Sequence, residues 1–209
     1  MTYASSPAET VRPPRTAAIV AVVALGINAL FLNILAVLAA IGLIRDGGVA
    51  PDGAVAIGTV ADIALVVLAG VAVIAWLWQA RRNADVIDDL AHDWGRPWVI
   101  AGWIVPLLNL WVPRSVVLGV WRASAPAGTS AWPVNAWWTL WLVGVVGGRV
   151  ANLDADGGFQ TILFPIVMEI AALAAQLAML IIWRVTRYQE AHAVRLRNAL
   201  TLGASPQPL

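Results

Sequence analysis

One apolar stretch constrains the fold more than any other part of the chain, because it can enter a bilayer and yet contains two prolines. It covers residues 97–122 and includes Pro106 and Pro113, with Asn109 between them. Proline removes a backbone donor and clashes with the preceding helical turn, so the stretch breaks into shorter pieces. A spanning helix needs about 20 apolar residues in sequence. The stretch therefore either crosses as one kinked helix or enters the membrane and returns on the same side.

Tryptophan and asparagine side chains surround the two prolines. Broken backbone at membrane depth is tolerated only where protein or water satisfies its polar groups, and a side-chain amide both donates and accepts hydrogen bonds. Indole rings are typical of the membrane–water interface, where an amphipathic ring lies at headgroup level. We therefore predict a re-entrant membrane motif that consists of Trp103, Pro106, Asn109, Trp111 and Pro113.

The composition indicates that most of the chain lies in lipid. Of 209 residues, 60% are hydrophobic and 12% charged, and the mean hydropathy is +0.78, whereas soluble domains carry about 25% charged residues. The chain is rich in tryptophan, with 12, and has no cysteine, which excludes disulfides, thiolate metal sites and thiol nucleophiles. It also lacks a basic nucleic-acid patch, a Walker loop and the common hydrolase motifs. We therefore predict a non-enzymatic protein that binds neither nucleic acid nor a cofactor.

Four long apolar runs predict an all-α, polytopic membrane protein with four transmembrane helices and one re-entrant element. Residues 1–15 are expected to form a disordered cytosolic tail, and residues 184–209 an amphipathic cytosolic helix and tail. A second amphipathic helical segment is expected in residues 81–96. Between the two ends lies a transmembrane bundle of residues 16–183, whose expected spans and re-entrant element are 16–44, 54–80, 97–122 (re-entrant), 134–152 and 161–183.

The arginines decide between four crossings and five, since loop arginines mark the cytoplasmic face. All 13 basic residues are arginine. With five crossings the count is six inside to seven outside, whereas with four crossings eleven lie inside, and Arg45 and Arg149 lie at the outer side. The eleven are Arg12, Arg15, Arg81, Arg82, Arg96, Arg114, Arg122, Arg184, Arg187, Arg195 and Arg197. This bias favours four spans in a bacterial plasma membrane, with both termini cytoplasmic.

Three ionisable residues lie within the expected spans, where a charge costs about 2.5–3.5 kcal/mol on insertion scales. Asp62 and Glu169 each lie about 12 Å below the outer end of their helices, and Arg149 lies near the outer end of its own. Gln176 shares a helix face with Glu169. These side chains form either a buried cluster that fixes helix register or a proton- or ion-handling site. A carboxylate that faces a water-filled vestibule without a role is a third interpretation.

Two further patterns have both a structural and a functional interpretation. Gly144 and Gly148 form a G-x-x-x-G motif, which lets helices approach closely within the chain or in a homodimer. His92 lies in an acidic run and has the donor types of a metal site. A solvated acidic helix face explains this run equally well, and we predict no metal there; the carboxylates concerned are Asp88, Asp89 and Asp93.

The spacing G-W-x-x-P-x-x-N-L-W-x-P, which runs from Gly102 to Pro113, resembles that of an actinobacterial membrane family described as domain of unknown function 4328. The resemblance covers roughly residues 54–183, and the spacing G-W-x-x-P-x-x-N-L-W-x-P is its most specific part. It implies a multi-helix membrane protein with no assigned activity. The residues that carry it are Trp78, Arg82, Asn83, Gly102, Trp103, Pro106, Asn109, Leu110, Trp111, Pro113, Trp121, Arg122, Ala123, Ser124, Trp137 and Trp138.

These observations lead to one leading hypothesis and two alternatives. The leading hypothesis is a non-enzymatic membrane protein whose re-entrant element forms a cytoplasmic-side groove that docks a partner protein or lipid. The first alternative is a small proton- or ion-coupled transporter or channel that uses Asp62 and Glu169. The second is an enzyme acting on lipid headgroups at the cytoplasmic interface, with its carboxylates supplied by residues 85–93.

Overall fold

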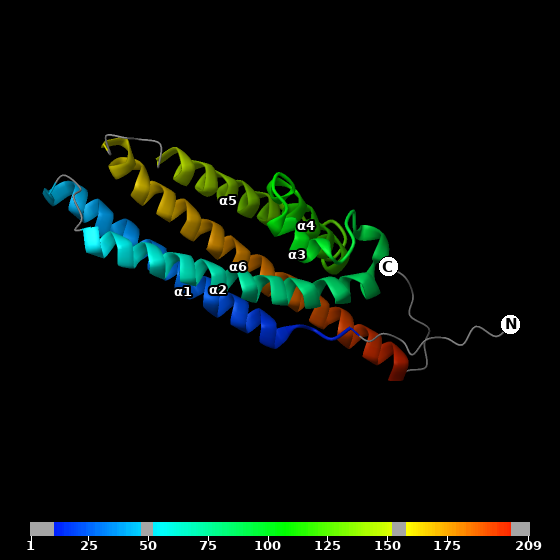
Figure 1. Ribbon diagram of the computed structural model, residues 1–209. Helices are drawn as coiled ribbons and strands as arrows, with labels where there is room; N and C mark the ends of the chain where they lie inside the picture. The colour runs from blue at the N-terminus through cyan, green and yellow to red at the C-terminus, as the bar shows by residue number, and fades with distance from the viewer. Residues whose placement is uncertain (1–10, 47–51, 152–157, 202–209) are drawn as a thin grey trace. The chain divides into compact units, whose positions relative to one another are not determined.

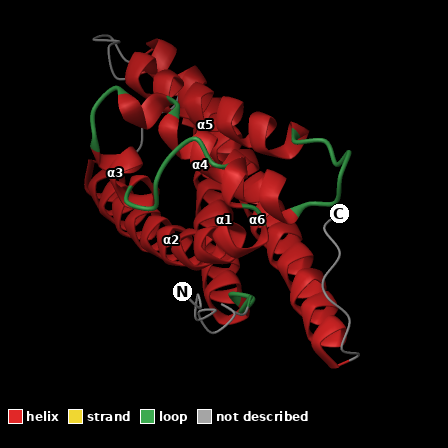
Figure 2. Cartoon of the chain, turned by 90° about the vertical axis from the view of Figure 1, so that its right-hand side faces the viewer, coloured by secondary structure: helices red, strands yellow, loops and turns green. Residues whose placement is uncertain are grey.

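A computed structural model describes residues 11–46, 52–151 and 158–201, with side chains described for 11–45, 57–150 and 162–199. Within these ranges every regular element is a helix and no strand occurs (Figure 2). The all-α fold class predicted from the sequence is therefore confirmed.

Four long helices account for most of the described chain (Figure 1). Two of them extend well beyond the apolar runs that predict them, because their helical backbone continues through polar sequence. One continues to Ile87, and the other continues past Trp183 to Thr201. The four are α1 (Arg15–Asp46), α2 (Asp52–Ile87), α5 (Trp132–Ala151) and α6 (Gly158–Thr201).

Three of these helices are long and apolar enough to cross a membrane. The qualifying segments are Arg15–Arg45, Ile57–Ile87 and Ile162–Ala199, with mean hydropathies of 2.4, 2.5 and 2.1. Helix α5 has 20 residues, about the length that spans a bilayer, but its indoles, glycines and Arg149 lower its hydropathy. Three of the predicted spans thus have the required length and composition, and the fourth stays a prediction.

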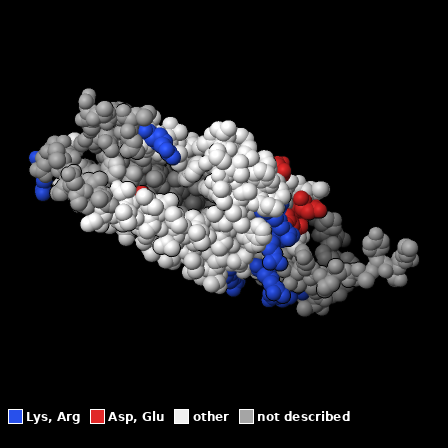
Figure 3. Space-filling view, viewed as in Figure 1, with Lys and Arg blue, Asp and Glu red and all other residues white. Residues whose placement is uncertain are grey.

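The chain divides into two compact units. Unit 1 consists of residues 1–18, 74–131 and 183–209, and unit 2 of residues 19–73 and 132–182. The arginines divide very unequally, since eleven of the 13 belong to unit 1 and only Arg45 and Arg149 to unit 2. Figure 3 shows the same contrast, with blue and red side chains gathered on one part of the visible face and few elsewhere.

Unit 2 is a helical bundle that packs through small residues. A Cβ atom on Gly26 of α1 would lie 3.8 Å from Met179 Sδ of α6, and one on Gly147 of α5 only 3.0 Å from Val167 Cγ2 of α6. The outward faces of α1 and α2 are also apolar, which is typical of helices surrounded by lipid. Exposed side chains on them include Ile19, Val23, Ile27, Leu30, Val60, Ile63, Val67 and Val71.

Unit 1 contains the short elements that follow α2: η1 (Asp89–Ala91), α3 (Trp98–Ile104), η2 (Leu108–Leu110) and α4 (Val112–Ser124). Helix α3 packs against α4 so closely that a Cβ on Gly102 would lie 2.7 Å from Val112 Cγ1. The chain therefore folds back on itself between these two helices. Helix α4 buries most of its length, including the complete side chain of Val120.

The turn between α3 and α4 coincides with the two prolines, as the sequence predicts. Helix α3 ends at Ile104, two residues before Pro106, and Pro113 lies in the first turn of α4, where its missing N–H costs nothing. Leu107 has a φ of 66°, in the left-handed region that residues other than glycine rarely adopt. Its side chain is nevertheless 71% exposed. A strained backbone thus carries an apolar side chain outward.

Candidate functional site

The centre of unit 1 is the buried side chain of Gln189 in α6. Its Nε2 donates hydrogen bonds to the carbonyl oxygen of Ala80 at 2.9 Å and to the hydroxyl of Ser124 at 3.0 Å. Its Oε1 accepts from Asn83 Nδ2 at 2.9 Å. Gln189, Ser124 and Asn83 are exposed by only 0%, 0% and 6%. One neutral amide therefore joins α2, the end of α4 and α6.

Asn83 extends this network to the segment that precedes α1. Its Oδ1 accepts a hydrogen bond from the Arg12 backbone N–H at 3.1 Å, and its Nδ2 donates to the Arg12 carbonyl oxygen at 2.8 Å. Val11 is buried beside this contact. Most of the predicted disordered tail, residues 1–10, lies outside the described residues. Residues 11–14 belong to unit 1, where Arg12 contacts α2.

Two aromatic contacts surround the glutamine on α6. The indole Nε1 of Trp76 donates to Thr186 Oγ1 at 3.1 Å, and both side chains are buried. The rings of Trp121 and Tyr188 meet edge-on with centroids 5.8 Å apart, an arrangement that aromatic pairs favour. Helix α6 is therefore held against both α2 and α4 by directed contacts as well as by burial.

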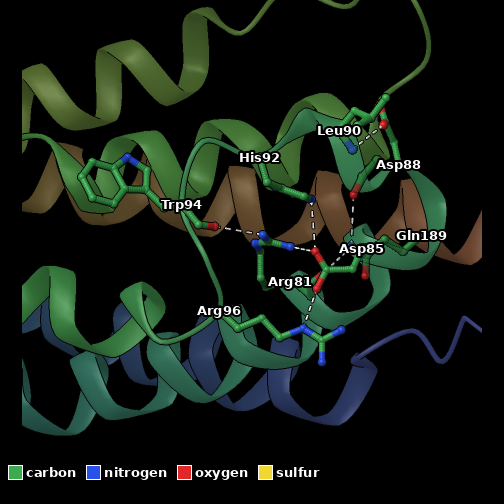
Figure 4. Close-up of polar contacts among 10 residues, drawn as sticks. Arg81, Asp85, Asp88, Leu90, His92, Trp94, Arg96 and Gln189 are labelled. Carbon is green, nitrogen blue, oxygen red and sulfur yellow. Dashed lines mark hydrogen bonds and ion pairs between the residues drawn. The ribbon is translucent and has the colours of Figure 1, made fainter.

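A second polar cluster lies where α2 meets the segment after η1 (Figure 4). The Asp85 carboxylate pairs with Arg81 through one oxygen and with Arg96 Nε at 2.5 Å through the other. Arg81 Nη2 also donates to the Trp94 carbonyl oxygen at 3.0 Å. The Arg81 side chain is only 6% exposed, and a buried charge of this kind needs such partners. The cluster fixes residues 94–96 to α2.

His92 fills the space between this cluster and α4. Its Nε2 lies 3.7 Å from Asp85 Oδ1, and its side chain is 3% exposed. On the other side the imidazole contacts Gly119 of α4, where an added Cβ would lie 2.7 Å from Nδ1 and 3.0 Å from the Ala91 carbonyl oxygen. Only glycine leaves room for the ring at this position. Figure 4 shows the imidazole directed toward the carboxylate.

The surroundings of His92 favour its neutral form. Burial lowers the pKa of the imidazole below its ordinary value, and the positive charge of Arg81 lowers it further. A hydrogen bond to the Ala84 backbone and the negative charges of Asp88 and Asp89 act in the opposite direction, but they do not cancel the decrease. Protonation of His92 is therefore linked to a loss of folding stability.

The acidic side chains around His92 have different partners and do not gather at one site. Asp88 Oδ1 caps η1 by accepting from the Leu90 backbone N–H at 3.1 Å, and Asp93 accepts from the Ser115 hydroxyl at 3.2 Å. Among the described residues, no group of three His, Asp or Glu side chains lies close enough to hold a metal ion. The two clusters have the chemistry of a structural junction: buried hydrogen bonds, paired charges and a neutral imidazole.

The predicted intramembrane cluster lies wholly in unit 2. Asp62 and Glu169 are half-buried, whereas Arg149 and Gln176 are exposed. Asp62 Oδ1 is buried and has no hydrogen-bond partner among the described residues. The ion pairs in the described part of the chain all lie in unit 1, so none joins these residues to one another. Their grouping into one site stays a prediction.

The predicted re-entrant motif is gathered around the turn between α3 and α4. Trp103 is half-buried in α3, Asn109 is half-buried in η2, and Pro113 is buried at the start of α4. Pro106 and Trp111 are exposed. The motif therefore has a buried side that holds α4 and an exposed side at the turn.

The predicted G-x-x-x-G motif faces α6 of the same chain. An added Cβ on Gly144 would lie 3.9 Å from Ile170 Cγ2, and one on Gly148 would lie 3.9 Å from Val167 Cγ1. Packing within the chain thus accounts for the spacing without a second copy.

Sequence reasoning missed Gln189, Asp85 and the buried role of Arg81. The sequence contains a signal for Gln189, because Ile182, Val185 and Gln189 are spaced so that they share one face of a helix. In the structure all three side chains are buried. A polar residue in such an apolar stripe indicates a buried partner. No comparable signal marks Asp85, because it is one of four aspartates in residues 85–93.

The family model for the domain of unknown function DUF4328 matches residues 50–190. The chain belongs to this family, as the motif around Pro106 and Pro113 predicts. No curated protein matches the chain. No solved structure matches it either. The matched region ends one residue after Gln189, so it includes the described helices that meet at this side chain.

Replacing Gln189 by leucine should destabilise the protein strongly. The substitution removes the hydrogen bonds that Asn83, Ser124 and Ala80 make to Gln189, at about 1 kcal/mol for each bond lost. We expect a total loss of about 3 kcal/mol, measured as the unfolding midpoint in detergent. Gln79→Leu is the matched control, since Gln79 is exposed and its amide makes one 3.5 Å contact with Ala75. Equal midpoints for the two variants would contradict the assigned role.

The stability of the protein should fall below about pH 6.5. Because the pKa of His92 is lower in the folded state than its ordinary 6.5, the unfolded chain binds this proton more readily as the pH falls. The stabilisation that neutral His92 provides is complete above pH 6.5 and decreases below it. We expect His92→Gln to reduce the difference between the unfolding midpoints at pH 7.5 and pH 5.5. The carboxylates are the same in the natural protein and in His92→Gln, so their contribution to the pH dependence is equal in both. If the difference between the two midpoints is unchanged in His92→Gln, His92 does not cause it.

Proposed function

We propose that the protein is a non-enzymatic, four-span plasma-membrane protein whose segment 97–122 enters the cytoplasmic leaflet, returns on the same side and docks there to lipid. The observation that carries this proposal is the contact set of Gln189. Ala80 lies before the broken segment and Ser124 after it, and both bond to the same amide within 3.0 Å. A full crossing would separate the two by about 30 Å of hydrocarbon.

The other ends that meet in unit 1 support the same topology. Arg15 at the start of α1 pairs with Glu190 of α6 at 2.7 Å. The beginning of α1, the end of α2 and the second half of α6 are therefore neighbours, as expected when α1 and α2 form one pair of crossings and α5 and α6 another. The eleven arginines of unit 1 favour the cytoplasmic side for this junction.

The exposed side of the turn supports docking to lipid. Ile104, Leu107 and Trp111 are exposed by 72%, 71% and 48%, although turns in water are normally built from small and polar residues. Helix α3 has seven residues and rises about 10 Å, which suits a shallow position at the boundary between headgroups and acyl chains. Arg96 and Arg114 flank residues 97–113, which include α3 and the exposed turn, as basic residues flank interfacial anchors.

Single cysteines test both parts of this proposal, because the natural chain has none. We expect a thiol reagent that cannot cross membranes to label Ala127→Cys only from the cytoplasmic side and Ile44→Cys only from the opposite side. Labelling of both from one side would overturn the four-span topology.

The same approach measures the depth of the turn. A fluorophore on Leu107→Cys should be quenched by nitroxide-labelled lipid, and one on Leu90→Cys by a water-soluble quencher. Leu90 is the matched control because it is 90% exposed in the acidic segment of the same unit. Aqueous quenching at both positions would contradict lipid docking.

A small proton-coupled transporter is the second candidate, and Asp62 is the observation that favours it. A buried carboxylate oxygen without a partner among the described residues lies on a helix apolar enough to cross a membrane. Such carboxylates serve as proton relays in pumps and transporters. The same helix has an exposed groove lined by Ile57, Val60, Ala61 and Ala64.

Proton flux into proteoliposomes tests this candidate. Asp62→Asn and Glu169→Gln should each abolish dissipation of a pH gradient if these carboxylates carry protons, since an amide cannot exchange one at neutral pH. The control is Glu190→Gln, which alters a carboxylate that is paired with Arg15 in unit 1. Flux that is absent from the natural protein, or unchanged in both variants, would exclude transport through Asp62.

A further inference from the structure

A basic groove runs between the start of α1 and the last turns of α6 in unit 1. Its volume is about 480 Å³, and it is open to the surface. The lining residues are Arg15, Arg187, Glu190, Ala191, Val194 and Arg195.

The groove has an excess of positive charge. Glu190 pairs with Arg15 Nε at 2.7 Å, whereas no carboxylate among the described residues pairs with Arg187 or Arg195. These two arginines are eight positions apart, two helical turns, and therefore share a face of α6. Guanidinium groups bind phosphate through two parallel hydrogen bonds, which makes arginine well suited to a phosphodiester.

An indole lies next to Arg187, one of the residues that line the groove. The guanidinium of Arg187 lies 5.5 Å from the ring centroid of Trp183, which is within the range of a cation–π contact. The indole itself is 57% exposed. An exposed indole next to an arginine is typical of residues at the membrane–water interface, where the ring meets acyl chains and the cation meets phosphate.

We propose that this groove binds the headgroup of an anionic phospholipid. A free phosphate ion would need only the guanidinium groups, whereas the groove also has an apolar wall formed by Ala191 and by Val194, which is 50% exposed. The phosphodiester lies between Arg187 and Arg195, and the glycerol and upper acyl carbons lie along this wall. The inference rests on the cytoplasmic position proposed for unit 1, but it concerns a surface separate from the turn at Leu107.

Lipid binding to the full chain in detergent, followed by native mass spectrometry, tests the proposal. The probes are short-chain phosphatidylglycerol, short-chain phosphatidylcholine and inorganic phosphate. We expect phosphatidylglycerol to bind at least about tenfold more tightly than phosphatidylcholine, and Arg187→Gln with Arg195→Gln to remove that preference. The matched control is Arg122→Gln with Arg197→Gln, which removes the same charge from exposed positions outside the groove.

Several results would overturn the proposal. If both double variants lose the preference for phosphatidylglycerol equally, the lipid is attracted by general positive charge and not by the groove. If Arg187→Gln with Arg195→Gln keeps the preference, the groove is not the binding site. Competition by inorganic phosphate as effective as that by phosphatidylglycerol would assign the groove to a free oxyanion. If the groove variant fails to fold, Val194→Glu places a carboxylate on the exposed apolar wall and should abolish the same preference. Cytoplasmic labelling of Ala127→Cys with no lipid preference would reject this site and leave the proposed topology in place.

Discussion

The structure of unit 1 depends on one neutral amide buried at the meeting point of three helices. A charged side chain at Gln189 would need a counter-ion to offset several kcal/mol of desolvation, and an apolar one would remove the hydrogen bonds to the carbonyl of Ala80 and the hydroxyl of Ser124. Glutamine matches the site because it has two donors and an acceptor. Asn83 then transmits the constraint to the backbone of Arg12, so the segment before α1 is held by the same hydrogen-bond network.

The two units are stabilised in different ways. Unit 2 has close packing at small residues such as Gly26 and Gly147, which is typical of apolar helices that lie in lipid. Unit 1 combines buried apolar residues with directed hydrogen bonds and paired charges. These contacts have fixed partners, and therefore they specify which helix ends meet. Fold specificity is concentrated in unit 1, although most of the apolar surface belongs to unit 2.

The sequence predicts the parts of this structure that depend on local pattern. Hydropathy is sufficient to predict the long helices, and the stereochemistry of proline is sufficient to predict the break near Pro106. Both features depend only on residues that are close together in the sequence. The contacts of Gln189 join residues 106 and 109 positions apart, so no local pattern reveals them. The acidic run shows a second reason: Asp85 faces two arginines, whereas Asp88 and Asp89 remain exposed. Composition alone does not distinguish an inward carboxylate from its outward neighbours.

Helix α4 explains how unit 1 can carry an exposed, strained turn. Two glycine contacts fix the neighbours of α4: Val112 packs on Gly102 of α3, and Gly119 of α4 packs on His92. A left-handed residue such as Leu107 costs about 1–3 kcal/mol and persists only where its surroundings determine it. The buried length of α4 provides that support on one side, and α3 provides it on the other. The turn is therefore held in place by its flanking helices while its apolar side chains remain exposed.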